Sequence, residues 1–150
     1  MHQEEIYMFS EAQNLVKDEF YFDAIEAFSN LIKKHPDSEL TDDAYFNIGL
    51  CYFQLNQFQN AITNFNKVIE EFPDATISIL DGGKEFGRTS AKCYYAIINC
   101  YLGLKRFDEI PGVLKNLDTY NDSYVKISDE EKLSFKQLAE KSIHIYNSNT

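Results

Sequence analysis

The feature that most constrains this chain is an internal repeat of two helical segments followed by a proline. Residues 45–53 align with residues 94–102 so that aromatic, aliphatic and cysteine positions coincide. Residues 21–28 align with residues 58–65, and a proline follows eight residues after each, at Pro36 and Pro73. Apolar residues three and four positions apart fit one face of a helix and not the alternation of a strand, and proline ends a helix. The repeat therefore predicts a stack of helical hairpins.

Three copies of this unit cover residues 5–38, 42–75 and 91–124. The first two are offset by 37 residues and the last two by 49, so the second gap holds an insertion at residues 74–90. The unit resembles the tetratricopeptide repeat, a hairpin of about 34 residues. The second copy carries the resemblance most fully, with Tyr45, Ile48, Gly49 and Tyr52 in the first helix and Phe58, Ala61, Phe65, Val68 and Pro73 in the second.

The resemblance implies an all-α protein with no sheet. It also implies a right-handed superhelical stack of three hairpins, which we expect to form one domain, residues 1–150. The 37-residue step, with Pro36-Asp37-Ser38 ahead of Asp42-Asp43-Ala44-Tyr45, is also similar to repeats of outer-membrane assembly lipoproteins and Tol-Pal coordinators. The spacing gives Gly49 and Ala12 a physical role, because a small residue lets the two helices of a hairpin approach closely. Ala24 and Ala61 serve the same purpose between adjacent repeats.

Two segments depart from even repetition. In the insertion we expect a loop followed by a helix that begins near Phe86; a backward extension of the third copy's first helix is the alternative. At the C-terminal end, Ser128-Asp129-Glu130-Glu131 has the spacing of a helix capping box. We therefore expect a capping helix at residues 128–147 that covers the apolar surface of the last repeat, as a finite stack requires.

Charge and apolar patterning restrict the class of partner. The formal charge is −10, and residues 1–75 carry 14 acidic and 4 basic side chains, whereas residues 76–150 carry 10 of each. Phosphates would be repelled by the acidic half, so we expect no nucleic-acid partner. The chain has no apolar run of the length that spans a membrane, about 18 residues, and no secretion signal at its start. These features, with three cysteines that are too few for a disulfide framework, favour the cytoplasm. The periplasm is the alternative if a signal sequence has been removed.

The candidate chemical motifs all have simpler structural readings. Residues 82–89 have the glycine spacing of a phosphate loop, but no strand precedes them and Arg88 stands where lysine is required. The cysteines occupy small buried positions of the repeat, and none of the three histidines is placed near a nucleophile. We expect no enzyme activity, no cofactor and no metal site.

The resemblance also implies which residues face the concave surface, since the first helix of each hairpin lines it. The candidate partner-binding groove consists of Phe9, Gln13, Phe46, Asn47, Leu50, Lys92, Tyr95 and Asn99. Phe9, Phe46 and Tyr95 occupy one equivalent position and would form an aromatic row that anchors a peptide or helix. The alternative is that these three rings only pack between neighbouring helices.

One known mode of binding fits these residues incompletely. Tetratricopeptide repeats that hold a chaperone's C-terminal carboxylate use lysine, asparagine and arginine side chains along the groove. Asn47 and Lys92 match two such places, whereas Phe9, Gln13 and Ala96 replace the others. Lys84, Arg88 and Lys92 would form a positive stripe for an acidic peptide if that segment were helical, and a solvated stripe is the alternative.

These observations predict a non-catalytic adaptor or scaffold that binds a peptide or helix of a partner protein in its concave groove. The alternative is a component of a cell-envelope or outer-membrane assembly complex. Membrane insertion is not expected, and association into a homo-oligomer is left open.

Overall fold

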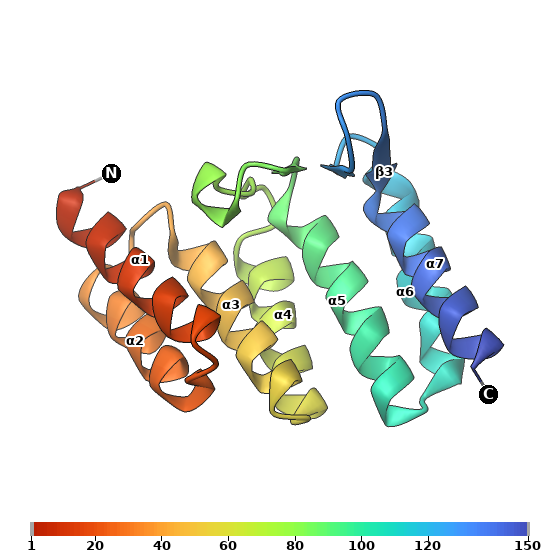
Figure 1. Cartoon of the computed structure of the whole chain (residues 1–150), viewed down its shortest axis with the longest axis horizontal. Coiled ribbons are helices and arrows are strands. Elements are labelled where there is room, and N and C mark those ends of the chain that lie inside the picture. The colour runs from red at the N-terminus through yellow and green to blue at the C-terminus, as the bar shows by residue number, and fades with distance from the viewer. Residues whose placement is uncertain (1, 150) are drawn as a thin grey trace.

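The computed structural model describes residues 2–149, and within them seven α-helices form a row of antiparallel hairpins (Figure 1). The helices are α1 (Gln3–Lys17), α2 (Tyr21–Lys34), α3 (Thr41–Gln54), α4 (Phe58–Glu71), α5 (Thr89–Leu104), α6 (Ile110–Asn116) and α7 (Phe135–Ser148). Short 3-10 turns lie at Ile79–Asp81 (η1), Phe107–Glu109 (η2) and Leu117–Thr119 (η3). The predicted stack of three hairpins followed by a last helix is confirmed.

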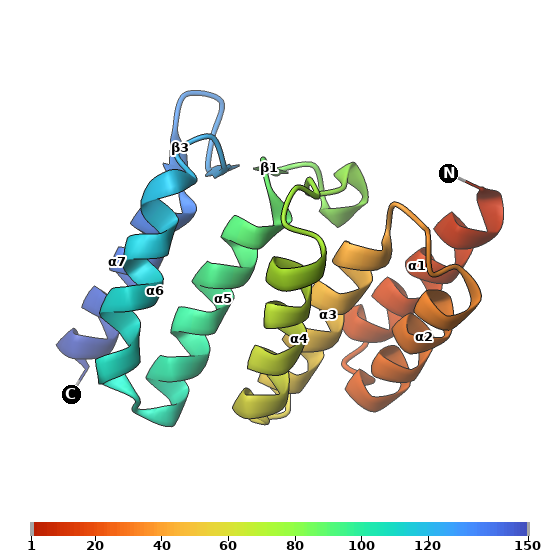
Figure 2. The same ribbon diagram turned by 180° about the vertical axis from the view of Figure 1, so that it is seen from behind.

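The helices form two layers. Helices α1, α3, α5 and α7 stand side by side in one layer, and α2, α4 and α6 form the layer behind it (Figures 1 and 2). Buried side chains between the layers make three consecutive apolar clusters, one for each hairpin and its neighbour. Each hairpin therefore depends on the next to bury its apolar face.

Small residues lie at close helix contacts, and prolines follow the ends of helices, as the sequence predicts. A Cβ added to Gly49 would lie 2.4 Å from the ring of Phe65, so α3 and α4 are in contact at that point. Ala24 and Ala61 are fully buried. Helices α2 and α4 end two residues before Pro36 and Pro73, as expected for residues that cannot continue a helix.

The expectation of no sheet is wrong in one small region. Strands β1 (Glu85–Phe86), β2 (Tyr124–Lys126) and β3 (Lys132–Ser134) pair antiparallel in that order. The strands join the insertion to the segment before α7, and the rings of Phe86 and Tyr124 stack 5.3 Å apart. Phe86 of the insertion thus packs against a strand that lies far along the chain, and local sequence spacing did not reveal this contact.

Two helix starts also differ from prediction. Helix α5 begins at Thr89 rather than near Phe86, because residues 85–86 are held in the sheet. The last helix begins at Phe135 and not at residue 128, and its capping box is formed by Ser134 and Gln137. The hydroxyl of Ser128 does accept a hydrogen bond from the Glu131 amide at 3.1 Å, but in the turn between β2 and β3.

Candidate functional site

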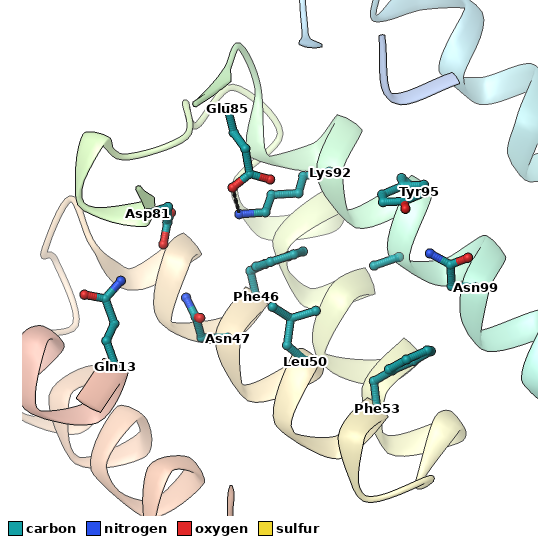
Figure 3. Close-up of a pocket in the computed structure, with 11 residues that line it drawn as sticks. Gln13, Phe46, Asn47, Leu50, Phe53, Asp81, Glu85, Lys92, Tyr95 and Asn99 are labelled. Atoms are coloured by element: carbon teal, nitrogen blue, oxygen red, sulfur yellow. Dashed lines mark hydrogen bonds and ion pairs between the residues drawn. The ribbon is translucent and has the colours of Figure 1, made fainter. Parts of the chain in front are cut away.

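A cavity of about 360 Å³ opens in the layer of α1, α3 and α5, beneath the insertion (Figure 3). Helix α3 supplies its floor, α5 one wall, and α1 and the insertion the rest. Its lining consists of Gln13, Phe46, Asn47, Leu50, Phe53, Asp81, Glu85, Lys92, Tyr95, Ala96 and Asn99. None of these residues belongs to α7, so within the described residues the C-terminal helix does not fill the cavity.

The structure brings seven of the eight predicted groove residues together around this cavity. The exception is Phe9, which is fully buried and packs edge-on against Phe28 with 5.6 Å between ring centroids. Phe9 fills the space between α1 and α2 beside the small residue Ala12, so it takes no part in an aromatic row. The partner-binding role of the other seven residues stays a prediction.

The apolar side chains of the lining differ in how strongly the core holds them. Phe46 is only 3% exposed and its ring lies 5.3 Å from that of Phe65, so it belongs to the core as much as to the cavity. Leu50 and Phe53 are half-buried on the same helix. Leu50 is therefore a side chain that a partner can contact, and its buried part packs against the apolar cluster shared by α3, α4 and α5.

Tyr95 and Asn99, one turn apart on α5, offer the cavity polar groups. Within the described residues, neither side chain donates or accepts a hydrogen bond, although both are half-buried. An amide with unused donors and acceptors is suited to binding the backbone of an extended or helical segment. Gln13, on the opposite side, donates instead to the Leu80 carbonyl at 2.9 Å and so ties α1 to the insertion.

Lys92 lines the cavity, but its charge is already matched. Its Nζ lies 2.8 Å from Oε1 of Glu85 and 4.2 Å from the ring centroid of Phe46, and the residue is 8% exposed. The interpretation of Lys84, Arg88 and Lys92 as a helical stripe is wrong, because the first two residues precede α5. Arg88 lies over the ring of Tyr120 at 4.1 Å and donates to the Thr119 carbonyl at 2.9 Å.

Acidic side chains gather where the insertion meets the start of α3. Asp42 accepts a hydrogen bond from the Thr89 hydroxyl at 2.7 Å. Asp43 is 1% exposed and lies against Asp81 of η1. Burial raises the pKa of the Asp43 carboxyl well above its usual range, and the neighbouring carboxyl of Asp81 raises it further.

Four lining residues lie outside the predicted set of groove residues; sequence reasoning placed Ala96 along the groove and missed Phe53, Asp81 and Glu85. Phe53 lies seven residues after Phe46 on α3, so helical spacing contained the signal for it. Asp81 and Glu85 belong to the insertion, whose fold over the groove depends on contacts distant in sequence, such as the bond from Gln13 to Leu80. No local pattern indicated those two residues.

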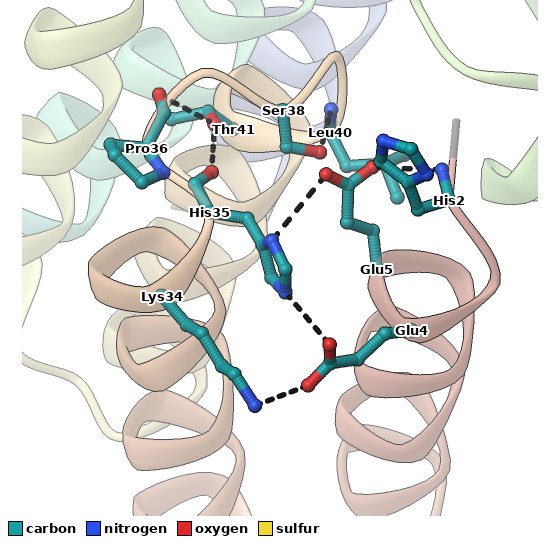
Figure 4. Close-up of polar contacts among 9 residues, drawn as sticks. All are labelled: His2, Glu4, Glu5, Lys34, His35, Pro36, Ser38, Leu40 and Thr41. Atoms are coloured by element: carbon teal, nitrogen blue, oxygen red, sulfur yellow. Dashed lines mark hydrogen bonds and ion pairs between the residues drawn. The ribbon is translucent and has the colours of Figure 1, made fainter.

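A second polar cluster joins the start of α1 to the end of α2 (Figure 4). The His35 ring lies between two carboxylates, with Nε2 3.5 Å from Glu4 and Nδ1 3.6 Å from Glu5. Glu4 also pairs with Lys34, which lowers the pKa of the Glu4 carboxyl. These contacts link the two helices of the first hairpin.

The three cysteines lie in the core of the protein. Cys51, Cys93 and Cys100 are unpaired and fully buried, and burial raises the pKa of each thiol. Across residues 2–149, no three histidine, cysteine or carboxylate side chains cluster in a way that would hold a metal ion. In the same residues, no helix has the length and apolar character needed to cross a membrane.

Comparisons with known proteins bear on the fold. Residues 42–75 match the model of the tetratricopeptide repeat family. The structure is similar to that of the Hsp90 co-chaperone Cns1 from Saccharomyces cerevisiae, with a TM-score of 0.67 at 15% sequence identity. The likeness covers 99% of this chain and 40% of that one, and at this identity it shows the fold alone. No curated protein sequence matches the chain. The similarity to outer-membrane assembly proteins stays a prediction.

Proposed function

Because residues 42–75 carry a tetratricopeptide repeat within a stack of the same fold, we propose that this protein is a non-catalytic interaction module. It binds a peptide or helix of a partner protein in the cavity between α1, α3 and α5. The observation that carries the proposal is the cavity itself, an apolar recess of about 360 Å³ in the layer of first helices. Recesses with a few convergent polar groups are the usual form of a binding site.

The lining supports an elongated ligand held by one apolar anchor. Leu50 and Phe53 form a half-buried apolar floor, and the free amide of Asn99 stands beside it. An anchor side chain in such a pocket supplies most of the affinity, and hydrogen bonds to the backbone orient the segment. The three buried, unpaired thiols suit a reducing compartment, so we place this function in the cytoplasm.

Affinity capture from cells of the source organism tests the proposal with two matched variants. Leu50→Gln changes the cavity floor, whereas Leu55→Gln changes a half-buried leucine at the end of α3 that does not line the cavity. We expect the wild type and Leu55→Gln to retain the same proteins, and Leu50→Gln to lose them while its circular dichroism spectrum shows that it is folded. Retention of the same proteins by folded Leu50→Gln would show that the cavity is not the binding site.

A further inference from the structure

We infer that the end of the cavity at Asp81, whose carboxyl contacts the buried Asp43, receives a cationic side chain of the partner, an ammonium or a guanidinium. The partner segment therefore carries a lysine or arginine next to the apolar residue that occupies the floor at Leu50 and Phe53. This inference rests on the proposed function and specifies the chemistry of the partner.

The charges of the lining are the first reason. Asp81, Glu85 and Lys92 are its charged residues, and all three lie toward the insertion (Figure 3). Lys92 is paired with Glu85 at 2.8 Å, so Asp81 is the remaining charged residue of the lining. Within the described residues, no lysine, arginine or histidine forms an ion pair with Asp81. The chain thus presents one unmatched negative charge to whatever enters the cavity.

Unsatisfied buried oxygens are the second reason. Both carboxyl oxygens of Asp43, and Oδ2 of Asp81, are buried, and apart from the contact between these two carboxyls no donor of the described residues serves them. Buried polar atoms in folded proteins nearly always have partners, and each one left without a partner is unfavourable. Asp43 lies three residues before Phe46 and seven before Leu50, so it shares the face of α3 that forms the cavity floor. A donor that enters the cavity meets Asp81, which lines it, and Asp43 contacts Asp81 from behind the lining.

A cationic side chain fits this end better than other occupants. A lysine ammonium supplies three hydrogen-bond donors and a guanidinium supplies five. Both also carry the positive charge that would balance the carboxylate of Asp81. A partner carboxylate would meet Asp81 and would have to break the pair of Lys92 with Glu85. The N-terminal half, with 14 acidic and 4 basic side chains, also steers a basic partner toward the groove.

Selection from a displayed library of random 12-residue peptides on the immobilised wild type provides the probe. The best-bound peptides are then synthesised, and their dissociation constants are measured with the wild type, Leu50→Gln, Asp81→Asn and Asp74→Asn. Asp74 is an exposed aspartate outside the cavity lining, so its variant controls for the loss of a negative charge. We expect a lysine or arginine at a fixed distance from an apolar residue, and binding that Leu50→Gln weakens.

Replacement of that lysine or arginine by norleucine isolates the charge. We expect this change to weaken binding to the wild type about tenfold or more, and binding to Asp81→Asn less than about threefold, since close charge pairs at interfaces couple strongly. Peptides that depend on Leu50 but lack a basic residue, or that bind Asp81→Asn as tightly as Asp74→Asn, overturn this inference and leave the proposed function standing. If no selected peptide depends on Leu50, both proposals fall.

Discussion

The ammonium of Lys92 and the carboxylate of Glu85 lie 2.8 Å apart, although one belongs to a repeat helix and the other to the segment that interrupts the repeats. The pair is largely buried, with side-chain exposures of 10% and 23%. It joins α5 to β1 directly at the cavity wall. The insertion is therefore a structural part of the groove and also supplies the counter-charge for its buried cation.

Removal of the Glu85 charge should destabilise the protein. In Glu85→Gln the ammonium of Lys92 stays buried without its nearest anion, and we expect the free energy of unfolding to fall by about 2 kcal/mol, the range for hydrogen bonds to charged groups. Glu71→Gln is the control, because it removes the anion of an exposed pair with Lys67 and should change stability by less than about 1 kcal/mol. Urea unfolding measures both, and equal midpoints for the two variants would contradict the role assigned to Glu85.

Much of the groove was predictable because helical spacing decides which side chains share a face. The resemblance to the tetratricopeptide repeat implied that Phe46, Asn47 and Leu50 face the groove, and all three line the cavity. Phe9 shows the limit of this reasoning. Its position is equivalent to that of Phe46, yet its side chain is held in the first hairpin against Phe28. The repeat pattern does not determine whether a ring packs between the two layers of helices, as that of Phe9 does, or also lines the cavity, as that of Phe46 does.

The C-terminal segment shows why a local signal can be placed wrongly. Ser128 with Glu131 and Ser134 with Gln137 have the same capping spacing, and both serines accept a hydrogen bond from an amide three residues later. Only Ser134 begins a helix, because strand pairing with β2 holds residues 132–134 extended. That pairing is a tertiary effect, so the sequence around Ser128 could not reveal it.

Two glycine substitutions should change stability in opposite directions. Alanine at Gly49 would place its Cβ 2.4 Å from the ring of fully buried Phe65, and such overpacking costs about 1–3 kcal/mol, more than the helix preference of alanine returns. Alanine at Gly112 in α6 meets no atom within 4 Å, so the helix preference should stabilise the protein by about 0.5 kcal/mol. Urea unfolding of the two variants tests this contrast. A stability gain in Gly49→Ala would show that α3 and α4 are not in close contact there.

The three cysteines should resist alkylation until the protein unfolds. Burial raises the pKa of Cys51 to about 11 and that of Cys100 to about 12, and it raises the pKa of Cys93 as well. Because the thiolate is the reactive form, the native protein should gain no mass from iodoacetamide at pH 8, whereas the urea-unfolded chain should gain three adducts. Intact mass spectrometry counts the adducts. A singly labelled species formed without denaturant would contradict the burial of one of these thiols.

Asp43 should make the protein lose stability as the pH rises. Burial, together with the carboxyls of Asp81 and Asp42, raises the pKa of Asp43 in the folded state, and the charge of Lys92 only partly opposes this shift. The folded chain then keeps a proton that the unfolded chain releases above about pH 4. The contribution of Asp43 to stability is complete below that pH and declines by at most about 1.4 kcal/mol per pH unit as the pH rises toward the folded-state pKa.

Asp43→Asn removes this dependence, because its amide neither binds nor releases the proton. Between pH 5 and pH 8 we expect the variant to gain stability relative to the wild type by about 1 kcal/mol per pH unit, measured by urea unfolding at each pH. Asp74→Asn, at the surface, serves as the control and should differ from the wild type by less than about 0.5 kcal/mol. A constant difference between Asp43→Asn and the wild type over this range would show that Asp43 carries no bound proton. In that case a group other than a proton on Asp43 would have to offset the repulsion between the carboxylates of Asp43 and Asp81.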